Sequence, residues 1–131
     1  MDAADYNPTV LDHFHHPRNA GPMPDANAVG EDRNPVCGDR MRLMLRIEDG
    51  RIVRATFLTQ GCGAAIATSS AATELLTGRR LDEAQRLSRD DFVAAVGGLP
   101  PSKVHCSVLA AGALRKALAD YAARGAQAPR A

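Results

Sequence analysis

The most regular pattern in the chain is an alternation of apolar and polar residues near its middle. Apolar side chains recur at every second position from Met41 to Ile47, and a second strand-like run resumes at Ile52. The two runs are joined by Asp49-Gly50, a dipeptide that favours the type I′ turn of a hairpin. Because a strand alternates its side chains between two faces, the pattern predicts a β-hairpin with one face on a core. Five arginines fit the wet face of this hairpin: Arg40, Arg42, Arg46, Arg51 and Arg54.

The segment before the hairpin combines a short helix with turn residues. Asn7 is placed to cap a helix that has Pro8 at its first position and ends before Pro17. Turn-forming residues then dominate 19–36, which predicts an irregular segment that leads to Cys37, with a short edge strand around 28–31. Three histidines end the helix and are interpreted as solvated surface rather than as a metal tract: His13, His15 and His16.

Helical patterns fill the second half of the chain. A run of small residues predicts a closely packed helix over 64–76 that stops at Gly78. Asp82 is expected to cap a short helix through Leu87, and 88–91 has the form of a capping box. Leu99-Pro100-Pro101 is predicted to be an extended turn, and a last helix is expected over about 107–123.

Together these elements predict one α+β domain over 1–131. Its core is expected to be a small antiparallel sheet of about three strands, packed on one side by several helices. A frayed tail is expected from about residue 124.

Composition narrows the class of protein. The 131 residues carry a formal net charge of +1, and 4% of them are aromatic. We therefore expect neither the basic surface nor the aromatic base-stacking surface that a nucleic-acid-binding protein uses. No apolar stretch is long enough to cross a membrane, and the acidic first residues do not begin a signal peptide. Three cysteines, an odd number, favour a reducing compartment over a disulfide framework. We therefore expect a soluble, cytoplasmic protein.

The three cysteines stand at predicted turns and are the strongest candidates for chemistry. Cys37 precedes the first hairpin strand and Cys62 follows the second, so antiparallel pairing brings both to one end of the sheet. Cys62 and Cys106 each open a helix, where unpaired N–H groups and the helix dipole are expected to lower the pKa of a thiol. Three soft thiolates in one place predict a site for iron or zinc.

Two residues compete for a fourth ligand position. Asp39 lies two residues after Cys37 and therefore returns to the same face of an extended segment. His105 is adjacent to Cys106 and offers an imidazole nitrogen, as in a zinc site of three cysteines and one histidine. The residues alone do not choose between them. The neighbouring glycines are expected to leave room above the sulfurs for an incoming donor or acceptor: Gly38, Gly61 and Gly63.

Three motifs carry a resemblance to a known family. They are Cys37-Gly38-Asp39, the run from Gly61-Cys62-Gly63 to Ser70, and the run from Leu99-Pro100-Pro101 to Ser107. With these motifs the chain resembles the iron-sulfur cluster assembly scaffolds of the IscU type and the N-terminal domain of NifU, over nearly its whole length. The resemblance implies a SufE/NifU-like fold and a scaffold, not an enzyme in the turnover sense, on which a labile [2Fe-2S] cluster is built and then transferred.

The resemblance also implies roles for residues and partners. Cys37, Cys62 and Cys106 would bind the cluster, Asp39 would keep it labile, His105 would be an alternative metal ligand, and Cys106 would accept persulfide sulfur. Implied partners are a cysteine desulfurase, DnaK-type and J-type chaperones and apo iron-sulfur proteins, with a homodimer as a further possibility. Tyr6 would lie near partner or dimer contacts.

Two features bear on which branch of the family the chain resembles. Ser102 replaces the valine of the family's chaperone-binding stretch Leu-Pro-Pro-Val-Lys. The residues around Cys37 also resemble the SufU branch, whose members bind zinc and accept sulfur. That branch carries an insertion between the second and third cysteines and lacks a histidine before the third, whereas this chain has His105 and no such insertion. The IscU interpretation is therefore favoured; a zinc-dependent persulfide acceptor and a structural zinc site are the alternatives.

Overall fold

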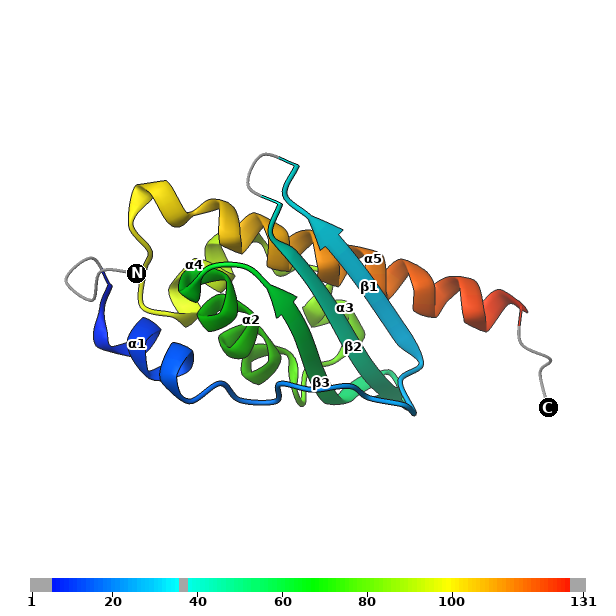
Figure 1. Ribbon diagram of the computed structural model, residues 1–131. Helices are drawn as coiled ribbons and strands as arrows, with labels where there is room; N and C mark the ends of the chain where they lie inside the picture. Colours follow the sequence, from blue (N-terminus) through cyan, green and yellow to red (C-terminus); the bar gives the residue numbers. More distant parts are fainter. Residues whose placement is uncertain (1–5, 36–37, 128–131) are drawn as a thin grey trace.

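The computed structural model describes residues 6–35 and 38–127, with side chains described as far as 124. Cys37 therefore lies outside the described residues. The elements follow one another in the order α1 (Pro8–His15), β1 (Ala28–Arg33), β2 (Arg40–Glu48), β3 (Arg51–Gln60), α2 (Gly63–Leu76), α3 (Leu81–Ala84), α4 (Arg89–Ala95), η2 (Pro101–Lys103) and α5 (His105–Gln127). The strands form one antiparallel sheet in the order β1-β2-β3, and the helices gather on one side of it (Figure 1). The expected α+β fold with a three-stranded sheet is confirmed.

The central hairpin forms as its sequence pattern predicts. β2 and β3 pair from Arg40 opposite Gln60 to Glu48 opposite Arg51. Asp49 and Gly50 join them with φ values of 52° and 73°, and two positive φ angles are what a type I′ turn requires. At its other end, the hairpin brings the residue before β2 next to the residue after β3.

The hydrophobic core lies between the sheet and two long helices. α5 packs over β1 and β2, and α2 packs over β3. Met41, Leu43, Leu45 and Ile47 of β2 point into this layer and are at most 2% exposed. They join one cluster with residues of α2, α4 and α5: Ala72, Leu76, Phe92, Leu109 and Leu114. The small side chains of α2 are nearly all buried, as expected for a helix that packs closely on several sides.

Helix α5 lies unusually close to the backbone of β1. A Cβ atom on Gly30 would collide with backbone atoms of Ala113 and Ala117. A Cβ atom on Gly112 would collide with the carboxylate of Asp32. Only glycine therefore permits this packing distance at residue 30, where the neighbouring atoms belong to the backbone.

Side chains of α5 also bind β1 directly. The N–H group of Val29 donates a hydrogen bond of 2.8 Å to Oδ2 of Asp120, and Lys116 Nζ donates one of 2.8 Å to Oδ1 of Asp32. These contacts, made from the second half of α5, fix the helix along β1.

Two connecting segments run along the outer edge of β3. Phe57 donates its N–H to the carbonyl of Asn19 and accepts from the N–H of Gly21, both at 3.0 Å. Ile52 donates to the carbonyl of Arg79 at 2.8 Å and accepts from Gly78 at 2.7 Å. The segments occupy hydrogen-bonding positions that a fourth strand would otherwise use.

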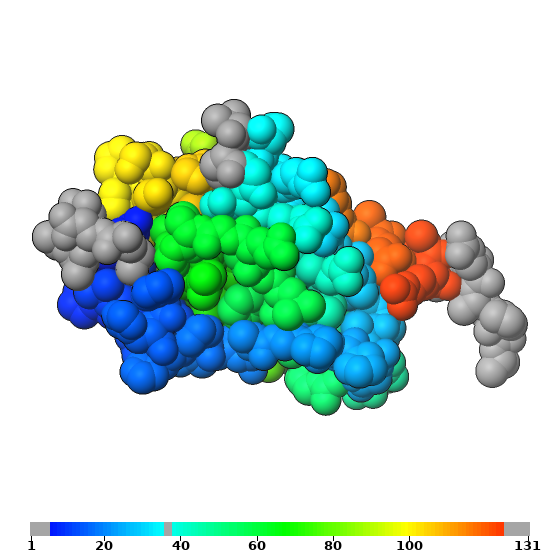
Figure 2. All heavy atoms as spheres, in the orientation of Figure 1, coloured from blue at the N-terminus to red at the C-terminus, as the bar shows by residue number. Residues whose placement is uncertain are grey.

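The sheet face opposite the helices carries the arginines of the hairpin. Arg42 and Arg54 have side chains that are 51% and 57% exposed, and they pair with Glu31 and Asp25. Figure 2 looks onto this side of the molecule, with the blue N-terminal segment along its lower edge. The prediction of a wet face is confirmed. Among the described helices, none combines the length and apolar character needed to span a bilayer.

Helix α1 begins as predicted, but one of its histidines is placed differently. Asn7 caps the helix through its Oδ1 atom, which accepts a hydrogen bond of 2.9 Å from the Val10 N–H. His15 and His16 are exposed, whereas His13 is 7% exposed and hydrogen-bonds Ser70 of α2. The interpretation of His13 as solvated surface was wrong, because its side of α1 packs on α2.

Several boundaries differ from the expected ones. β1 continues to Arg33, and α5 begins at His105 and remains helical through Gln127, where the sequence predicted fraying from about 124. The N-cap of α3 is Arg80, whose N–H donates to Glu83 at 3.0 Å, so Asp82 lies in the first turn and is not the cap. The capping box at Ser88 is confirmed, since its N–H donates to Oδ2 of Asp91 at 2.7 Å.

Candidate metal centre

Three of the predicted ligands converge at one end of the sheet. One ligand atom each from Asp39, Cys62 and Cys106 lie within 4.8 Å of one another. Asp39 immediately precedes β2, Cys62 is the N-cap of α2, and Cys106 is the second residue of α5. The pairing of Arg40 with Gln60 brings the first two together, and the packing of α5 on the sheet adds the third.

The two described thiols differ in exposure. Asp39 and Cys62 are half-buried, whereas Cys106 is 2% exposed. Cys106 packs with Ala64 and Ala65 of α2, and Leu99 contacts the same cluster. This packing was not predicted from the sequence, although the run of small apolar residues after Cys62 is a signal for it.

Burial reverses the expected ionisation of Cys106. Desolvation is the main cause that raises the pKa of this thiol to about 12, and the neighbouring Cys62 and Asp39 raise it further; Lys103 opposes them. The prediction that the start of α5 would lower the pKa was wrong. The dipole at a helix start is worth about 2 kcal/mol at most, and here removal from water outweighs it. Cys106 in the metal-free protein is therefore a neutral thiol near pH 7.

His105 does not join Asp39 and the two cysteines. Within the described residues, the group that could hold a metal ion contains no histidine. His105 is half-buried and lines a cavity of about 180 Å³ together with residues 32–35, Val108 and Leu109. Of the two candidates for the fourth ligand, the structure brings Asp39 to the described thiols, and His105 lies beside them on the side of β1.

Not all of the glycines leave open space. A Cβ atom on Gly38 would meet none of the described residues beyond its chain neighbours within 4 Å, but one on Gly61 would lie 2.7 Å from Cγ of Asp39. The expectation of free room is therefore wrong for Gly61, because the carboxylate of Asp39 fills that room.

The donor set fits iron or zinc. Two thiols and a carboxylate combine soft and hard ligands, and thiolates select zinc and iron-sulfur units. Binding would release the proton of Cys106, because a metal-bound thiol is deprotonated. Cys37, the remaining predicted ligand, belongs to the connection between Asn34 and Gly38, whose ends are joined by a hydrogen bond of 2.8 Å.

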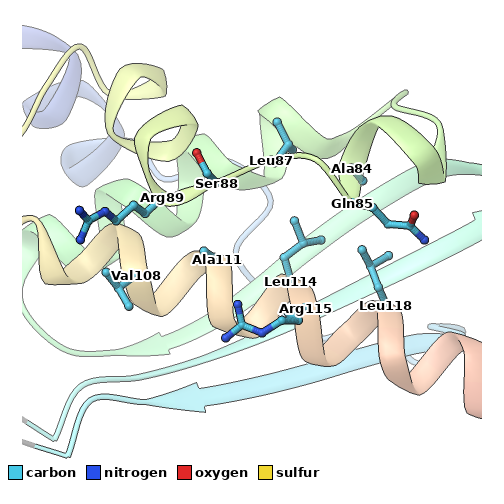
Figure 3. A pocket seen from close by; sticks show the side chains of 10 residues that line it. All are labelled: Ala84, Gln85, Leu87, Ser88, Arg89, Val108, Ala111, Leu114, Arg115 and Leu118. Carbon is cyan, nitrogen blue, oxygen red and sulfur yellow. The ribbon is translucent and has the colours of Figure 1, made fainter.

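A second hollow lies away from this site. A cavity of about 480 Å³ is lined by the connection from α3 to α4 and by α5, with Leu87, Leu114 and Leu118 among the side chains around it (Figure 3). Among the residues that the structure describes, those around this cavity include no cysteine, histidine or carboxylate. It is therefore not the predicted metal site.

The fold and the site define a small α+β protein that gathers thiols and a carboxylate at one end of its sheet. Comparison with known proteins shows which class this is. Residues 5–128 match the family described as NifU-like N terminal domain. The chain belongs to this family.

Named relatives are similar over most of the chain. An iron-sulfur cluster assembly scaffold protein IscU from Archaeoglobus fulgidus is 52% identical over 116 residues, which cover 88% of this chain and 76% of that protein. An iron-sulfur cluster assembly enzyme IscU from Drosophila melanogaster is 44% identical over 120 residues, covering 88% of this chain and 77% of that protein. These identities confirm the family resemblance that the motifs indicated.

A solved structure shows the same fold. The crystal structure of an iron-sulfur cluster assembly scaffold protein for the SUF system from Fervidobacterium islandicum superimposes with a TM-score of 0.71. It covers 90% of this chain and 99% of that one at 20% sequence identity. At this identity the likeness concerns the fold.

Proposed function

We propose that this protein is a scaffold that assembles a labile [2Fe-2S] cluster and transfers it to apo-proteins. The observation that carries the proposal is the convergence of Asp39, Cys62 and Cys106 within 4.8 Å. Cys37 is proposed as the further cluster ligand, with His105 as an alternative ligand when the site rearranges. Iron and sulfide are the substrates of this assembly, and the assembled cluster is its cargo.

The mixed donor set supports release of the cluster. Four thiolates hold electron-transfer clusters permanently, whereas a carboxylate is a harder and more readily exchanged ligand for iron. Asp39 is also half-buried, so water or an incoming donor reaches this side of the site more easily than the Cys106 side. We infer that exchange begins at Asp39.

Sulfur is proposed to arrive as a persulfide on a cysteine desulfurase, with Cys106 as its acceptor. In that step the thiolate of Cys106 attacks the outer sulfur, the S–S bond of the donor breaks, and the donor cysteine leaves as a thiolate. The persulfide then formed on Cys106 yields the sulfide of the cluster only after an external reductant supplies two electrons, which restores the Cys106 thiolate. Because Cys106 is buried and its thiol has a pKa of about 12, acceptance requires that the partner opens the site and that a base removes the proton.

The segment that precedes α5 is suited to that opening. Leu99 contacts both the cluster around Val10 and the one around Cys106, while Pro101 and Ser102 are exposed. A protein that engages residues 99–103 would therefore pull on the packing of Cys106. This supports chaperone-type partners at this segment, with Ser102 as the residue that would alter their affinity.

The free thiols of Cys62 and Cys106 suit a reducing compartment such as the cytoplasm.

Anaerobic reconstitution tests the proposal. The protein is incubated with ferrous iron, cysteine, a reductant and a cysteine desulfurase, and the bound iron and sulfide are measured with the visible absorption. A chromophore with two irons and two sulfides per site supports scaffolding. Persulfide on the protein together with bound zinc, and no chromophore, would establish the alternative of a zinc-dependent persulfide acceptor.

A substitution sharpens the test. Asp39→Ala is expected to lengthen the lifetime of the reconstituted cluster, because the exchangeable ligand is lost. Cys62→Ser is expected to prevent accumulation of the cluster. Equal cluster lifetimes in the Asp39→Ala variant and the unchanged protein would remove Asp39 from the mechanism.

A further inference from the structure

The carboxylate of Asp39 rests against the α-carbon of Gly61. A Cβ atom placed on Gly61 would lie 2.7 Å from Cγ of Asp39 and 3.0 Å from each of its carboxylate oxygens. Contacts this short are not tolerated between real side chains, so the carboxylate occupies the volume that any other residue at position 61 would need. Both oxygens are equally distant, which means that the carboxylate lies flat over the glycine.

The hairpin explains why these two residues meet. Arg40 pairs with Gln60 at the end of the β2–β3 ladder, so Asp39 and Gly61 are the next residues outward on the two strands. Directly opposite residues of an antiparallel pair project to the same face, with Cβ atoms about 4.5–5.5 Å apart. A side chain at position 61 would therefore stand directly beside Asp39 and push its carboxylate outward.

The backbone of Asp39 has little freedom to yield instead. Its carbonyl accepts a hydrogen bond of 2.8 Å from the N–H of Asn34, and β2 begins at the next residue. The carboxylate is the movable end of a short side chain with two torsions. An added methyl group at position 61 would therefore displace the carboxylate and leave the strand in place.

We propose that Gly61 is a positioning residue that seats the Asp39 carboxylate within reach of the Cys62 and Cys106 sulfurs. Because glycine has no side chain, the carboxylate of Asp39 can occupy the volume beside residue 61. Glycine is required at this position for that volume. Backbone conformation is not the reason, because Gly61, unlike Gly38, does not have a positive φ in the range that favours glycine. This inference rests on the proposed ligand role of Asp39.

The test uses Co²⁺ as the probe, because cobalt-thiolate absorption reports both affinity and ligand set without cluster assembly. Co²⁺ is titrated into four purified proteins: the unchanged chain, Gly61→Ala, Asp39→Ala and the double variant. Loss of support around a metal ligand costs about 10- to 100-fold in affinity. We expect Gly61→Ala to weaken Co²⁺ binding by about 10-fold in the unchanged background, with a ligand-field spectrum close to that of Asp39→Ala.

The double variant shows whether Gly61→Ala acts by displacing the carboxylate of Asp39 or in another way. With the carboxylate already removed, the three atoms nearest to the methyl group are gone, so Gly61→Ala should change Co²⁺ affinity little in the Asp39→Ala background. An equal loss in both backgrounds, or no loss in either, would overturn the seating role. If Asp39→Ala itself leaves Co²⁺ affinity and spectrum unchanged, the ligand role proposed for Asp39 fails, and the seating role fails with it.

Folding supplies an independent check. If Gly61→Ala unfolds because the methyl group collides with the carboxylate, the double variant must recover the fold, as judged by circular dichroism. Failure of both variants to fold would show that Gly61 serves the backbone and would refute the proposal.

Discussion

Nδ1 of His13 lies 2.8 Å from Oγ of Ser70, a hydrogen bond that ties α1 to α2. The N–H of Arg18 donates to the same oxygen at 2.8 Å, so the hydroxyl proton of Ser70 is available to an unprotonated Nδ1. Burial is the main cause that lowers the pKa of His13 from its ordinary value of 6.5; Arg18 acts in the same direction, and Glu74 and Asp12 oppose it. The packed ring is therefore neutral at neutral pH.

This leads to a prediction for stability against pH. The unfolded chain binds a proton on His13 at higher pH than the folded chain, so the free energy of unfolding should fall as the pH drops below about 6.5 and approaches the lower pKa of the folded state. His13→Asn removes the titrating group, so its unfolding free energy should depend less on pH between about 7 and 5. Urea unfolding at several pH values measures this, with the exposed His15→Asn variant as control. Parallel curves for His13→Asn and the unchanged protein would contradict the prediction.

The difference between the two described cysteines predicts their reactivity. Cys62 is half-buried, whereas Cys106 is 2% exposed and its thiol has a pKa of about 12. Because the thiolate is the reactive form, iodoacetamide should modify Cys62 well before Cys106 in the metal-free protein. Peptide mapping by mass spectrometry after timed labelling gives both rates in one sample, and labelling in urea shows that both thiols react once exposed. Faster modification of Cys106 in the folded protein would contradict the described burial.

Metal removal should leave the protein folded. The main core, formed by the three strands and by helices α2 to α5, contains none of the candidate ligands. A structural zinc site contributes about 10–16 kcal/mol in small finger peptides, and its loss would unfold a domain that depends on it. After treatment with a chelator we expect unchanged helical circular dichroism and a cooperative thermal transition. Cooperative unfolding on chelation would instead favour the structural zinc site.

Gly30 of β1 and Gly112 of α5 lie where the two elements pack together, and we expect them to differ in how well they tolerate substitution by alanine. At Gly30 a Cβ atom would meet the backbone of α5, which cannot turn aside, so Gly30→Ala should destabilise by about 3 kcal/mol or more. At Gly112 the three nearest atoms all belong to the side chain of Asp32, and alanine inside a helix gains about 0.5–1 kcal/mol over glycine. Gly112→Ala should therefore cost less, and Asp32→Ala should relieve it. Urea unfolding gives the free energy of unfolding of each variant. Equal losses of stability in Gly30→Ala and Gly112→Ala would contradict this prediction.

Local signals predicted most of the fold. The Asp49-Gly50 turn, the Asn7 cap and the capping box at Ser88 each depend on residues within a few positions of one another, and each is confirmed. The predictions were wrong where packing between segments far apart in the sequence determines the environment of a residue. Nothing near His13 in the sequence indicates that Ser70 will bury it, and the cap at Arg80 replaced the expected cap at Asp82 through the side chain of Glu83.

The site shows the same division. Hairpin pairing was sufficient to predict that the residues just before β2 and just after β3 lie at one end of the sheet, since that depends only on strand register. Asp39 and Cys62 lie together at that end, whereas the predicted proximity of Cys37 to Cys62 involves a residue outside the described part of the chain. The ionisation of Cys106 was predicted wrongly, because its position at a helix start was visible in the sequence and its enclosure by Ala64 and Ala65 was not. The choice of Asp39 over His105 beside the described thiols likewise required the placement of α5 on the sheet.

The bonds that Phe57 and Ile52 make to flanking segments limit how two copies of this molecule could associate. An edge strand with unpaired backbone N–H and C=O groups can pair with a strand of another molecule, which extends the sheet and is a common route to fibres and insoluble aggregates. Here that edge of β3 is already occupied near both ends. Self-association through β3 would first have to displace these native segments, so the fold itself disfavours polymerisation along this side of the sheet.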